Sequence, residues 1–523
     1  MRYKPFLISL FVFITAFMVF SANIGGLSIY SLDEAKNSEC AREMLERGDF
    51  IVPTFNYELR TDKPPVHYYF MIVAYKLFGV NEFSARFFSS VFGALTVLIT
   101  FLFAQKYLGK REAFLSFIAL ISSLHFSIQF HMAVPDPYLI FWINAALFSF
   151  YIGFKEKKGV FIYLFYIFMG LGVLTKGPVA VVLPSGIILL YLIFTRNLTV
   201  ENLKFLRVLS GIAVLLIVSL PWYIAVYLKT EGKWVQEFIF KHNIHRFSQP
   251  MEGHGGIFLL TFLFVFVGML PFSVFIFQAL KKVWEDRKND FLLFLMIFAG
   301  VYTLFFAVSK TKLPNYTVPV YPSLAIIIGY YLSRIHTSKI SSLIVSVILY
   351  ILISIGVIAG LYFGIKNEPA ISDLSYLSIW FIFLVFGGIF ALMFLLKKNY
   401  VMAILSLSVF SIFTGFIFFY KAFPPVDKRN PVMQMLPLIE KDKPVRYYRN
   451  FNPAFVFYLR RHISPVEKAE IKSFLSSKEK VYILTRKRYL KDFKNIENAV
   501  ILKVVKDLFE SKVSALVSNR RER

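Results

Sequence analysis

The chain begins MRYKPFLISLFVFITAFMVFSANIGG (residues 1–26), a basic tip followed by an apolar run of about 20 residues. A helix needs a run of that length to cross a bilayer. Similar runs recur through the 523 residues, which are 57% hydrophobic and only 17% charged, with a mean hydropathy of +0.61. Soluble domains carry about 25% charged residues. The sequence therefore predicts a polytopic α-helical membrane protein.

The apolar runs predict about thirteen transmembrane helices. The first run resembles a secretory signal peptide, but no small-residue cleavage site follows, so we expect it to remain as a span. Residues 65–80 are too short to cross easily and are interrupted by Lys76, which favours an interfacial or re-entrant helix. The predicted spans are 6–26, 84–106, 112–132, 136–154, 160–175, 178–195, 207–228, 257–280, 291–309, 315–333, 340–364, 374–396 and 401–420.

Loop charges predict the orientation of these spans. With the N-terminus in the cytoplasm, every predicted inner loop contains Lys or Arg, as the positive-inside rule requires. A full crossing by 65–80 would invert all later loops and break the rule. Three segments then lie outside the cytoplasm, on the periplasmic side: 27–66, 229–256 and 421–523.

The tail of the chain forms a second predicted unit. We expect residues 1–420 to form the transmembrane domain and 421–523 a small periplasmic α/β domain. The tail holds 24 Lys and Arg against 11 Asp and Glu. This excess of 13 positive charges is half of the net charge of +26. The other basic residues lie mostly in short loops, so the charge does not indicate nucleic acid. The charge of the tail instead favours binding to anionic lipid headgroups. A single cysteine, Cys40, excludes an intramolecular disulfide.

The first outer loop carries a charged helix and a rigid turn. Asp33-Glu34 follows the first span and opens a stretch, AKNSECAREMLE, with helical periodicity. Asp62-Lys63-Pro64-Pro65 is a charged turn that two prolines make rigid. Either feature alone is also typical of a solvated loop whose surface ion pairs contribute little.

Further charged residues lie at other predicted outer hinges. Charges near bilayer depth usually mark function, although a single lysine there also suits an interfacial anchor. Charged residues at several outer hinges, all at the same depth in the membrane, favour one shared functional site. The residues are Asp136, Lys176, Lys310 and Lys312, with His242, Arg246 and His254 in FKHNIHRFSQPMEGH.

Cations gathered beside carboxylates at the outer leaflet indicate a lipid phosphate as ligand. Lys and Arg neutralise phosphate oxygens, and fixed cations accelerate the departure of a phosphate that gains charge in the transition state. A carboxylate can accept a proton from an attacking hydroxyl or stabilise an oxocarbenium-like sugar. No nucleotide-binding motif is present. These features fit a lipid-linked sugar donor.

The chain resembles the GT-C glycosyltransferases, particularly the bacterial lipid A aminoarabinose transferases and their relatives, the protein O-mannosyltransferases. The resemblance covers about residues 1–335. It rests on DEAKNSECAREMLERGDFIVPTFN, DKPPVHYY, NEFSARFFSSVFG, LTKGPV, FKHNIHRFSQPMEGH and SKTKLPNYTVPVYPSLA, which occur together at the family's spacing.

The resemblance implies roles for individual residues. Asp33 looks like the catalytic carboxylate, with Asp136 and Glu34 as further acidic candidates. The residues expected to bind the donor phosphate are Lys63, Arg246, Tyr316, Lys176 and Lys312. No cofactor is expected, and a divalent metal is the lesser alternative, with His242, His254 and Asp62 as its candidate ligands. The chain has Asp62 where relatives often have Glu, and Lys36-Asn37 where they often have Arg-Tyr, so the sugar stays open.

The sequence therefore predicts an inverting glycosyltransferase of the inner membrane. It would move an aminoarabinose- or uronic-acid-like monosaccharide from polyprenyl (undecaprenyl) phosphate to lipid A or a related envelope acceptor on the periplasmic side. The alternatives are a protein O-mannosyltransferase-like enzyme acting on Ser or Thr hydroxyls and, from another class, a polyprenyl-lipid transporter. A transporter usually carries midplane charges and repeated halves, and the sequence shows neither.

Overall fold

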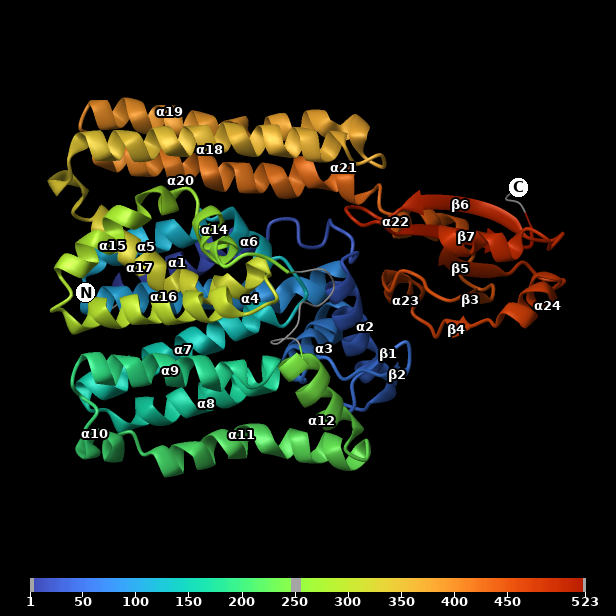
Figure 1. Cartoon of the computed structure of the whole chain (residues 1–523), viewed down its shortest axis with the longest axis horizontal. Helices are drawn as coiled ribbons and strands as arrows, with labels where there is room; N and C mark the ends of the chain where they lie inside the picture. Colours follow the sequence, from blue (N-terminus) through green and yellow to red (C-terminus); the bar gives the residue numbers. More distant parts are fainter. Residues whose placement is uncertain (1–3, 246–254, 521–523) are drawn as a thin grey trace.

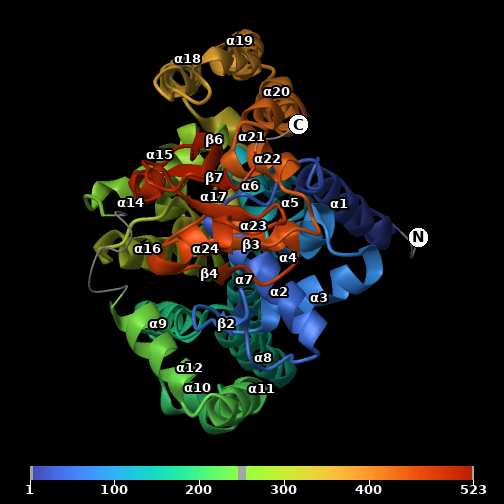
Figure 2. The same ribbon diagram turned by 90° about the vertical axis from the view of Figure 1, so that its right-hand side faces the viewer.

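The computed structural model describes residues 4–245 and 255–520. Most of the long helices run alongside one another and form an elongated bundle, with a β-sheet beyond one end (Figure 1). In Figure 2 that end faces the viewer: the sheet covers its centre, with α2 (Leu32–Arg47) and α3 (Val66–Phe78) beside it. The predicted helical membrane architecture with a small C-terminal sheet is confirmed.

Each predicted span corresponds to a helix or a pair of helical segments, but fewer than thirteen are long uninterrupted spans. In the described residues, eight helices are long and apolar enough to cross a membrane, or up to ten if two bent pairs each count as one span. The eight are α4 (Glu82–Tyr107), α7 (Asp136–Glu156), α8 (Gly159–Lys176), α10 with α11 (Val200–Phe205, Val208–Lys229), α16 (Asp290–Val308), α18 (Ile340–Lys366), η5 with α19 (Ser372–Phe381, Ile382–Leu396) and α20 with η6 and α21 (Tyr400–Ile417, Phe418–Ala422, Phe423–Asp427).

The other predicted spans are broken or short. The segments α5 (Lys110–Ile121) and α6 (Leu124–Phe130) meet at 71°, and α14 (Leu259–Gly268) meets η2–α15 (Phe272–Phe275, Ile276–Glu285) at 116°. The helices α1 (Lys4–Phe20) and α9 (Val179–Phe194) are short and apolar. The span predicted at 315–333 divides into η3 (Pro314–Val320) and α17 (Tyr321–Leu332). The count of thirteen thus exceeds the eight to ten that helix length and composition support.

The centre of the bundle explains why one helix is so short. All twelve residues of α17 are buried, and it packs mainly against α5, α15 and α16. A helix enclosed by other helices does not have to match the bilayer thickness along its own length. By contrast, α11 and α18 leave most of their surface exposed, as expected for helices that face lipid.

The helix α2 forms where the acidic pair of the first outer loop predicts one. The Ser31 hydroxyl accepts a hydrogen bond from the Glu34 backbone N–H, and Gly48 ends the helix in the left-handed conformation. Acidic side chains in the first turn and Arg47 in the last turn complement the helix dipole. A two-stranded hairpin, β1 (Thr54–Phe55) and β2 (Glu58–Leu59), then leads to α3.

The helix α3 occupies the segment predicted to be interfacial or re-entrant. Its 13 residues are too few to cross a bilayer, and it packs against α2, α4 and α8. The structure confirms a short helix there; its depth in the membrane stays a prediction.

The C-terminal sheet has five strands in the order β4-β3-β5-β7-β6. The strand β3 is parallel to β4 and β5, whereas β7 is antiparallel to β5 and β6. Its elements are α22 (Pro431–Met435), η7 (Leu436–Leu438), β3 (Val445–Tyr447), α23 (Ala454–Leu459), β4 (Ser464–Pro465), η8 (Lys468–Glu470), α24 (Ile471–Leu475), β5 (Tyr482–Arg486), η9 (Lys487–Phe493), β6 (Val500–Lys506) and β7 (Val513–Ser518). The division of the chain at residue 421 stays a prediction.

Several contacts join the sheet to the first outer loop. The side chain of Asn56, in the β1–β2 turn, donates to the Ile463 carbonyl at 3.0 Å and accepts from the Ile463 N–H at 2.9 Å. The helix α23 packs against α2, and the Tyr458 hydroxyl donates to Glu82 at 2.9 Å. These contacts fix the sheet over the end of the bundle that carries the cavity described next.

Candidate functional site

A cavity of about 610 Å³ opens at the end of the bundle nearest α2. Its walls come from the ends of α7, α8, α9 and α16, from η3, from the turn before α3, and from the helix η1 (Phe238–His245). Most of its lining is apolar, including Val179, Val182 and Phe305. Four charged side chains and one histidine also line it: Asp62, Lys63, Asp136, Lys176 and His242.

An ion pair joins two of the predicted site residues on one wall. Lys176, in the last turn of α8, places its Nζ 2.6 Å from Oδ1 of Asp136, in the first turn of α7. Both positions suit the helix dipoles. The same Oδ1 accepts a hydrogen bond from Nδ2 of Asn315 at 3.1 Å, and the Lys176 ammonium lies 5.0 Å from the centre of the Tyr316 ring. Asp136 and Tyr316 thus hold Lys176 at the cavity wall.

Asp62 and His242 form a second pair in the lining of the cavity. Nε2 of His242, in the π-helix η1 (Phe238–His245), lies 3.0 Å from Oδ1 of Asp62. Buried Arg60 approaches the same carboxylate at 3.5 Å. Burial tends to raise the pKa of Asp62, but Arg60, His242, Lys63 and Lys36 together hold it below its usual value. Asp62 is therefore ionised at neutral pH.

Lys63 completes the charged part of the cavity. It is half-buried in the turn whose next two residues, Pro64 and Pro65, are buried against the start of α3. Four of the predicted residues, Lys63, Asp136, Lys176 and Tyr316, therefore share one cavity although they come from distant parts of the sequence. Asp62 and His242 join them there.

Asp33 does not line this cavity. It lies exposed in the first turn of α2. Its charge is one of several that raise the pKa of Arg60 against the lowering effect of burial. Its predicted role as the catalytic carboxylate stays a prediction.

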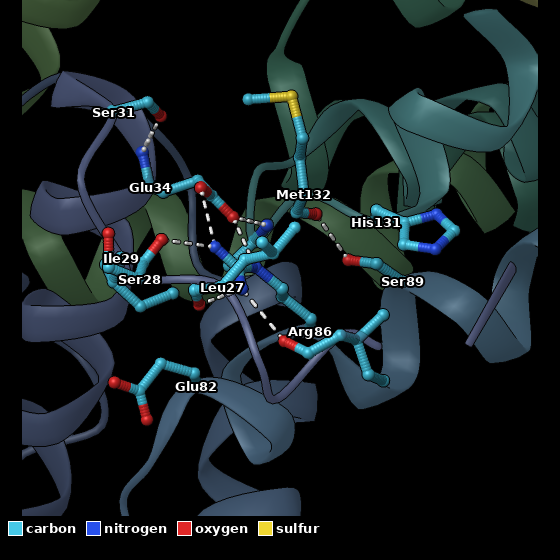
Figure 3. Close-up of polar contacts among 12 residues, drawn as sticks. Leu27, Ser28, Ile29, Ser31, Glu34, Glu82, Arg86, Ser89, His131 and Met132 are labelled. Atoms are coloured by element: carbon cyan, nitrogen blue, oxygen red, sulfur yellow. Dashed lines mark hydrogen bonds and ion pairs between the residues drawn. The ribbon is translucent and has the colours of Figure 1, made fainter. Parts of the chain in front are cut away.

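Glu34 does not line the cavity, because its carboxylate is committed to a buried network (Figure 3). Oε1 accepts from Nε of Arg86 and from the Ala133 N–H, both at 2.8 Å, and Oε2 accepts from Nη2 of Arg86 at 3.0 Å. Glu34 and Arg86 are 5% and 4% exposed. A carboxylate so buried and paired holds the fold and is not placed to react.

Arg86 uses all five of its N–H groups in this network. Besides Glu34, it donates to the backbone carbonyls of Ile24, Leu27 and Ser28 at 2.7–2.8 Å (Figure 3). It therefore joins the end of the first span, the start of α2 and, through Glu34, the segment before α7. Sequence reasoning missed Arg86, although a lone arginine in the run 84–106 was a signal.

Lys312 does not line the cavity either. Its ammonium is buried and donates to the backbone carbonyls of Phe306, Ala307 and Ser309 at 2.5–3.0 Å. Its three donors therefore satisfy the carbonyls at the C-terminus of α16. The lysine closes that helix and is not presented to a phosphate.

Two of the other candidates, Arg246 and His254, lie outside the described residues. Within residues 4–245 and 255–520, no group of three or more His, Cys, Asp or Glu side chains is placed to hold a metal ion. Asp62 and His242 supply two donors of suitable chemistry, which is fewer than the four ligands usual for zinc. The metal therefore stays a lesser alternative, and no step below depends on it.

Asn315 is a further residue that the sequence prediction did not single out. It lies in the quoted segment TKLPNYTVPVYP, between Lys312 and Tyr316, and its amide orients Asp136. Nothing in the sequence separates Asn315 from other polar loop residues, because its contact depends on η3 packing against the start of α7.

The cavity combines two kinds of surface that suit a lipid phosphate. Lys63 and Lys176 present positive charge in a chamber whose lining is otherwise mostly apolar. An apolar chain fits those walls, and a phosphate beside the two ammonium groups would be neutralised. The Lys176–Asp136 pair keeps the ammonium in place before a ligand arrives, so little reorganisation is needed.

Sequence comparison finds relatives of known and unknown activity. Residues 62–224 match the family described as dolichyl-phosphate-mannose-protein mannosyltransferase. An uncharacterized protein of Aquifex aeolicus (strain VF5) is 28% identical over 95% of both chains. The undecaprenyl phosphate-alpha-4-amino-4-deoxy-L-arabinose arabinosyl transferase of Aeromonas hydrophila is 33% identical over 58% of this chain. The chain matches just over half, 55%, of that transferase's length.

Solved structures share the fold along nearly the whole chain. ArnT from Cupriavidus metallidurans, crystallised with undecaprenyl phosphate, has a TM-score of 0.82 over 99% of both chains at 20% identity. The archaeal oligosaccharyltransferase AglB from Archaeoglobus fulgidus has a TM-score of 0.54, covering 94% of this chain and 70% of its own, at 13% identity. These likenesses establish the GT-C fold of this membrane protein.

Proposed function

We infer that this chain, which has the GT-C fold and is related in sequence to undecaprenyl phosphate-aminoarabinose transferases, is a polyprenyl-phosphate-sugar-dependent glycosyltransferase of the inner membrane. It transfers a monosaccharide of the aminoarabinose or uronic acid type from undecaprenyl phosphate to lipid A or a related envelope acceptor. The observation that carries this proposal is the mostly apolar cavity that Lys63 and Lys176 both line.

The two lysines hold the donor phosphate in this proposal. The polyprenyl chain lies against the apolar walls, and the phosphate lies between Lys63 and Lys176. The sugar then points out of the cavity toward α2, where Asp33 is exposed. This arrangement leaves the anomeric carbon open to an acceptor from the face opposite the phosphate.

The transfer is a single displacement. An acceptor oxygen forms a bond to the anomeric carbon as the bond from that carbon to the donor phosphate oxygen breaks, and polyprenyl phosphate leaves with the electron pair. The leaving phosphate gains negative charge, which Lys63 and Lys176 stabilise. Displacement from the opposite face inverts the anomeric configuration.

The acceptor decides the role of Asp33. A lipid A phosphate oxygen is already anionic and needs no general base, so Asp33 would orient it or stabilise positive charge on the sugar. A hydroxyl acceptor must lose a proton, which Asp33 would accept. Asp136 is paired with Lys176 at 2.6 Å and acts by orienting that lysine.

The predicted orientation places the reaction on the periplasmic side. The cavity, residues 27–66 and the C-terminal sheet all lie at one end of the bundle, whereas the basic loops after α4, α7 and α9 lie at the other (Figure 1). Because short basic loops stay in the cytoplasm, the positive-inside rule supports a periplasmic site.

A protein mannosyltransferase-like activity is the second candidate, supported by the family match over residues 62–224. The cavity would serve either enzyme, since both use a polyprenyl-type phosphate donor. They differ in the acceptor, which reaches the site from the side of α2. The transporter hypothesis finds less support, because the charged residues gather at one end of the bundle and not at its middle.

Reconstitution tests the proposal directly. The purified chain in lipid nanodiscs is mixed with undecaprenyl phosphate-aminoarabinose and lipid A, and products are followed by mass spectrometry. We expect lipid A to gain the sugar, Lys63→Ala and Asp33→Asn to abolish the gain, and Lys398→Ala, on a loop at the opposite end, to leave it unchanged.

The outcomes separate the two candidates. A glycosylated Ser or Thr peptide with unmodified lipid A would favour the second candidate. Transfer by Lys63→Ala at the wild-type rate would remove that lysine from the site. The transferase proposal would be contradicted if the protein bound undecaprenyl phosphate normally but transferred no sugar from any donor to any acceptor.

A further inference from the structure

A second cavity lies toward the other end of the bundle from the candidate site. It has a volume of about 280 Å³ and is bounded by α7, α8, α9, α11 and the short helix α10. The helix α9 connects the two cavities: its first turn lines the candidate site, whereas Ser185, Ile188 and Leu192 line the second one. We call this second cavity the α9–α11 groove.

The α9–α11 groove is apolar and open on one side. Of its lining side chains, only Ser185 and Tyr166 carry polar atoms, and the Tyr166 hydroxyl donates to the Leu206 carbonyl at 3.2 Å. Leu189 of α9 and Ile212 of α11 both line it and are 49% and 45% exposed. In the predicted topology α9 and α11 both lie in the bilayer, so this opening faces hydrocarbon and an apolar chain can enter it.

Three basic residues stand at one end of the groove. Arg196, Lys204 and Arg207 are exposed, and each lies within two residues of a groove-lining leucine: Leu198, Leu203 and Leu206 respectively. Nη1 of Arg207 donates to the Tyr163 hydroxyl at 3.1 Å, which holds the guanidinium beside the start of α8. Glu201 is the one acidic residue in the described segment 196–207, so the segment keeps a net positive charge. We call the three basic residues the basic rim.

We propose that the α9–α11 groove and its basic rim bind an anionic phospholipid, with an acyl chain in the groove and the headgroup phosphate at the rim. The groove supplies apolar contact without a buried polar partner to satisfy, and the rim supplies the charge complementary to a phosphate. In the predicted topology the rim lies in the cytoplasmic leaflet, where lipids are anionic. This proposal does not depend on the proposed transferase activity.

Lipid retention by the full-length protein tests the charge part of the proposal. The protein is reconstituted in nanodiscs of phosphatidylglycerol and phosphatidylcholine in equal amounts, released, and examined by native mass spectrometry. We expect retained phosphatidylglycerol to exceed phosphatidylcholine. The variant R196Q/K204Q/R207Q should lose most of that preference, because each cation near a membrane surface contributes about fivefold in affinity.

The matched control removes the same kinds of charge elsewhere. K281Q/R287Q/K288Q changes one arginine and two lysines at the α15–α16 connection, which lines neither cavity. It should keep the wild-type preference. Equal losses in both triple variants would reduce the effect to general surface charge and overturn the proposal, as would a wild-type protein with no preference for phosphatidylglycerol.

A filled groove tests the apolar part independently. Ser185→Trp places an indole in the open side of the groove and should reduce retained lipid of both headgroups at least severalfold while leaving the basic rim intact. Val345→Trp, on the exposed face of α18, is the control and should retain lipid as the wild type does. Unchanged retention by Ser185→Trp would show that no chain occupies the groove.

Discussion

At the scale of single residues, the candidate site depends on charges that are paired before any ligand binds. Lys176 is held by Asp136 and Tyr316, and Asp62 is held by Arg60 and His242. Such pairing fixes the position of a cation in a largely apolar cavity, where an unpaired charge would cost several kcal/mol. It also means that mutations there affect folding and activity together, so the two effects have to be separated.

Substitutions in the Lys176–Asp136 pair can separate the effect on folding from the effect on activity. Lys176→Met should lower the free energy of unfolding by about 3 kcal/mol, because it leaves the Asp136 carboxylate buried and without its cation. The double variant K176M/D136N should recover most of that stability, yet sugar transfer should stay low in both. Thermal unfolding in detergent and the nanodisc transfer assay measure the two quantities. Recovery of transfer by the double variant would show that Lys176 has no role in binding phosphate.

The Asp62 carboxylate predicts a dependence of stability on pH. Its pKa in the folded protein lies below the unfolded value of about 3.9, so its ion pairs stabilise the fold fully above that pH. The contribution is lost as the pH falls through the folded pKa. Asp62→Asn should therefore destabilise the protein at pH 6 and have less effect at pH 3. An effect that grows toward pH 3 would contradict this sign.

At the scale of elements, α2 is positioned by one buried arginine. Arg86 donates to three backbone carbonyls before α2 and to Glu34 in its first turn, next to Asp33. Glu34 also accepts from the Ala133 N–H, close to Asp136. A single side chain therefore links the start of α2, which carries Asp33, to the segment before α7, which begins with Asp136.

Replacing Arg86 should disturb this link. In Arg86→Gln we expect turnover to fall at least 100-fold, while the affinity for undecaprenyl phosphate, bound at Lys63 and Lys176, changes by less than about fivefold. Isothermal titration and the transfer assay measure the two effects. Arg334→Gln breaks another arginine–glutamate pair, with Glu112 at 3.0 Å at the opposite end of the bundle, and is the control. Equal losses of turnover in both variants would indicate general destabilisation.

At the scale of the whole molecule, the C-terminal sheet is docked on the first outer loop. Asn56 bonds to both backbone polar groups of Ile463, and Lys506 contacts Glu368 at 2.5 Å, which ties the sheet to the bundle after α18. The sheet thus closes over α2 and the hairpin that lead into the site. This docking predicts that the first outer loop and the sheet become ordered together.

Asn56→Ala tests this docking. It removes both hydrogen bonds to Ile463, and it places alanine at a φ of 54°, a left-handed conformation that asparagine tolerates better. Amide hydrogen exchange should become faster in β1–β2 and in β4, but not in α17 at the centre of the bundle. Asn498→Ala, on an exposed loop of the tail, should leave exchange unchanged. Unaltered exchange in Asn56→Ala would show that other contacts hold the sheet.

Several features of this protein could be predicted from the sequence because they depend on local patterns. Apolar run lengths locate the helices, the Ser31 cap with Asp33 and Glu34 begins α2, and Gly48 ends it. The exact number of crossings could not be predicted, because bends at 122–123 and 269–271 and the enclosure of α17 depend on packing between helices. Lys63, Asp136, Lys176 and Tyr316 share a cavity, as their positions at outer hinges suggest.

Only the tertiary structure decided which charged residues face the cavity. By sequence, Glu34 and Lys312 are as suitable as Asp136 and Lys176, since all four lie beside apolar runs. In the folded chain Glu34 is buried against Arg86, and Lys312 turns back to the carbonyls at the end of α16. The physical reason is that a buried charge must be paired, and the partner that pairs it comes from another part of the chain. The sequence determined that this protein is a membrane-embedded helical bundle, and the fold determined which of its charges remain placed for a phosphate.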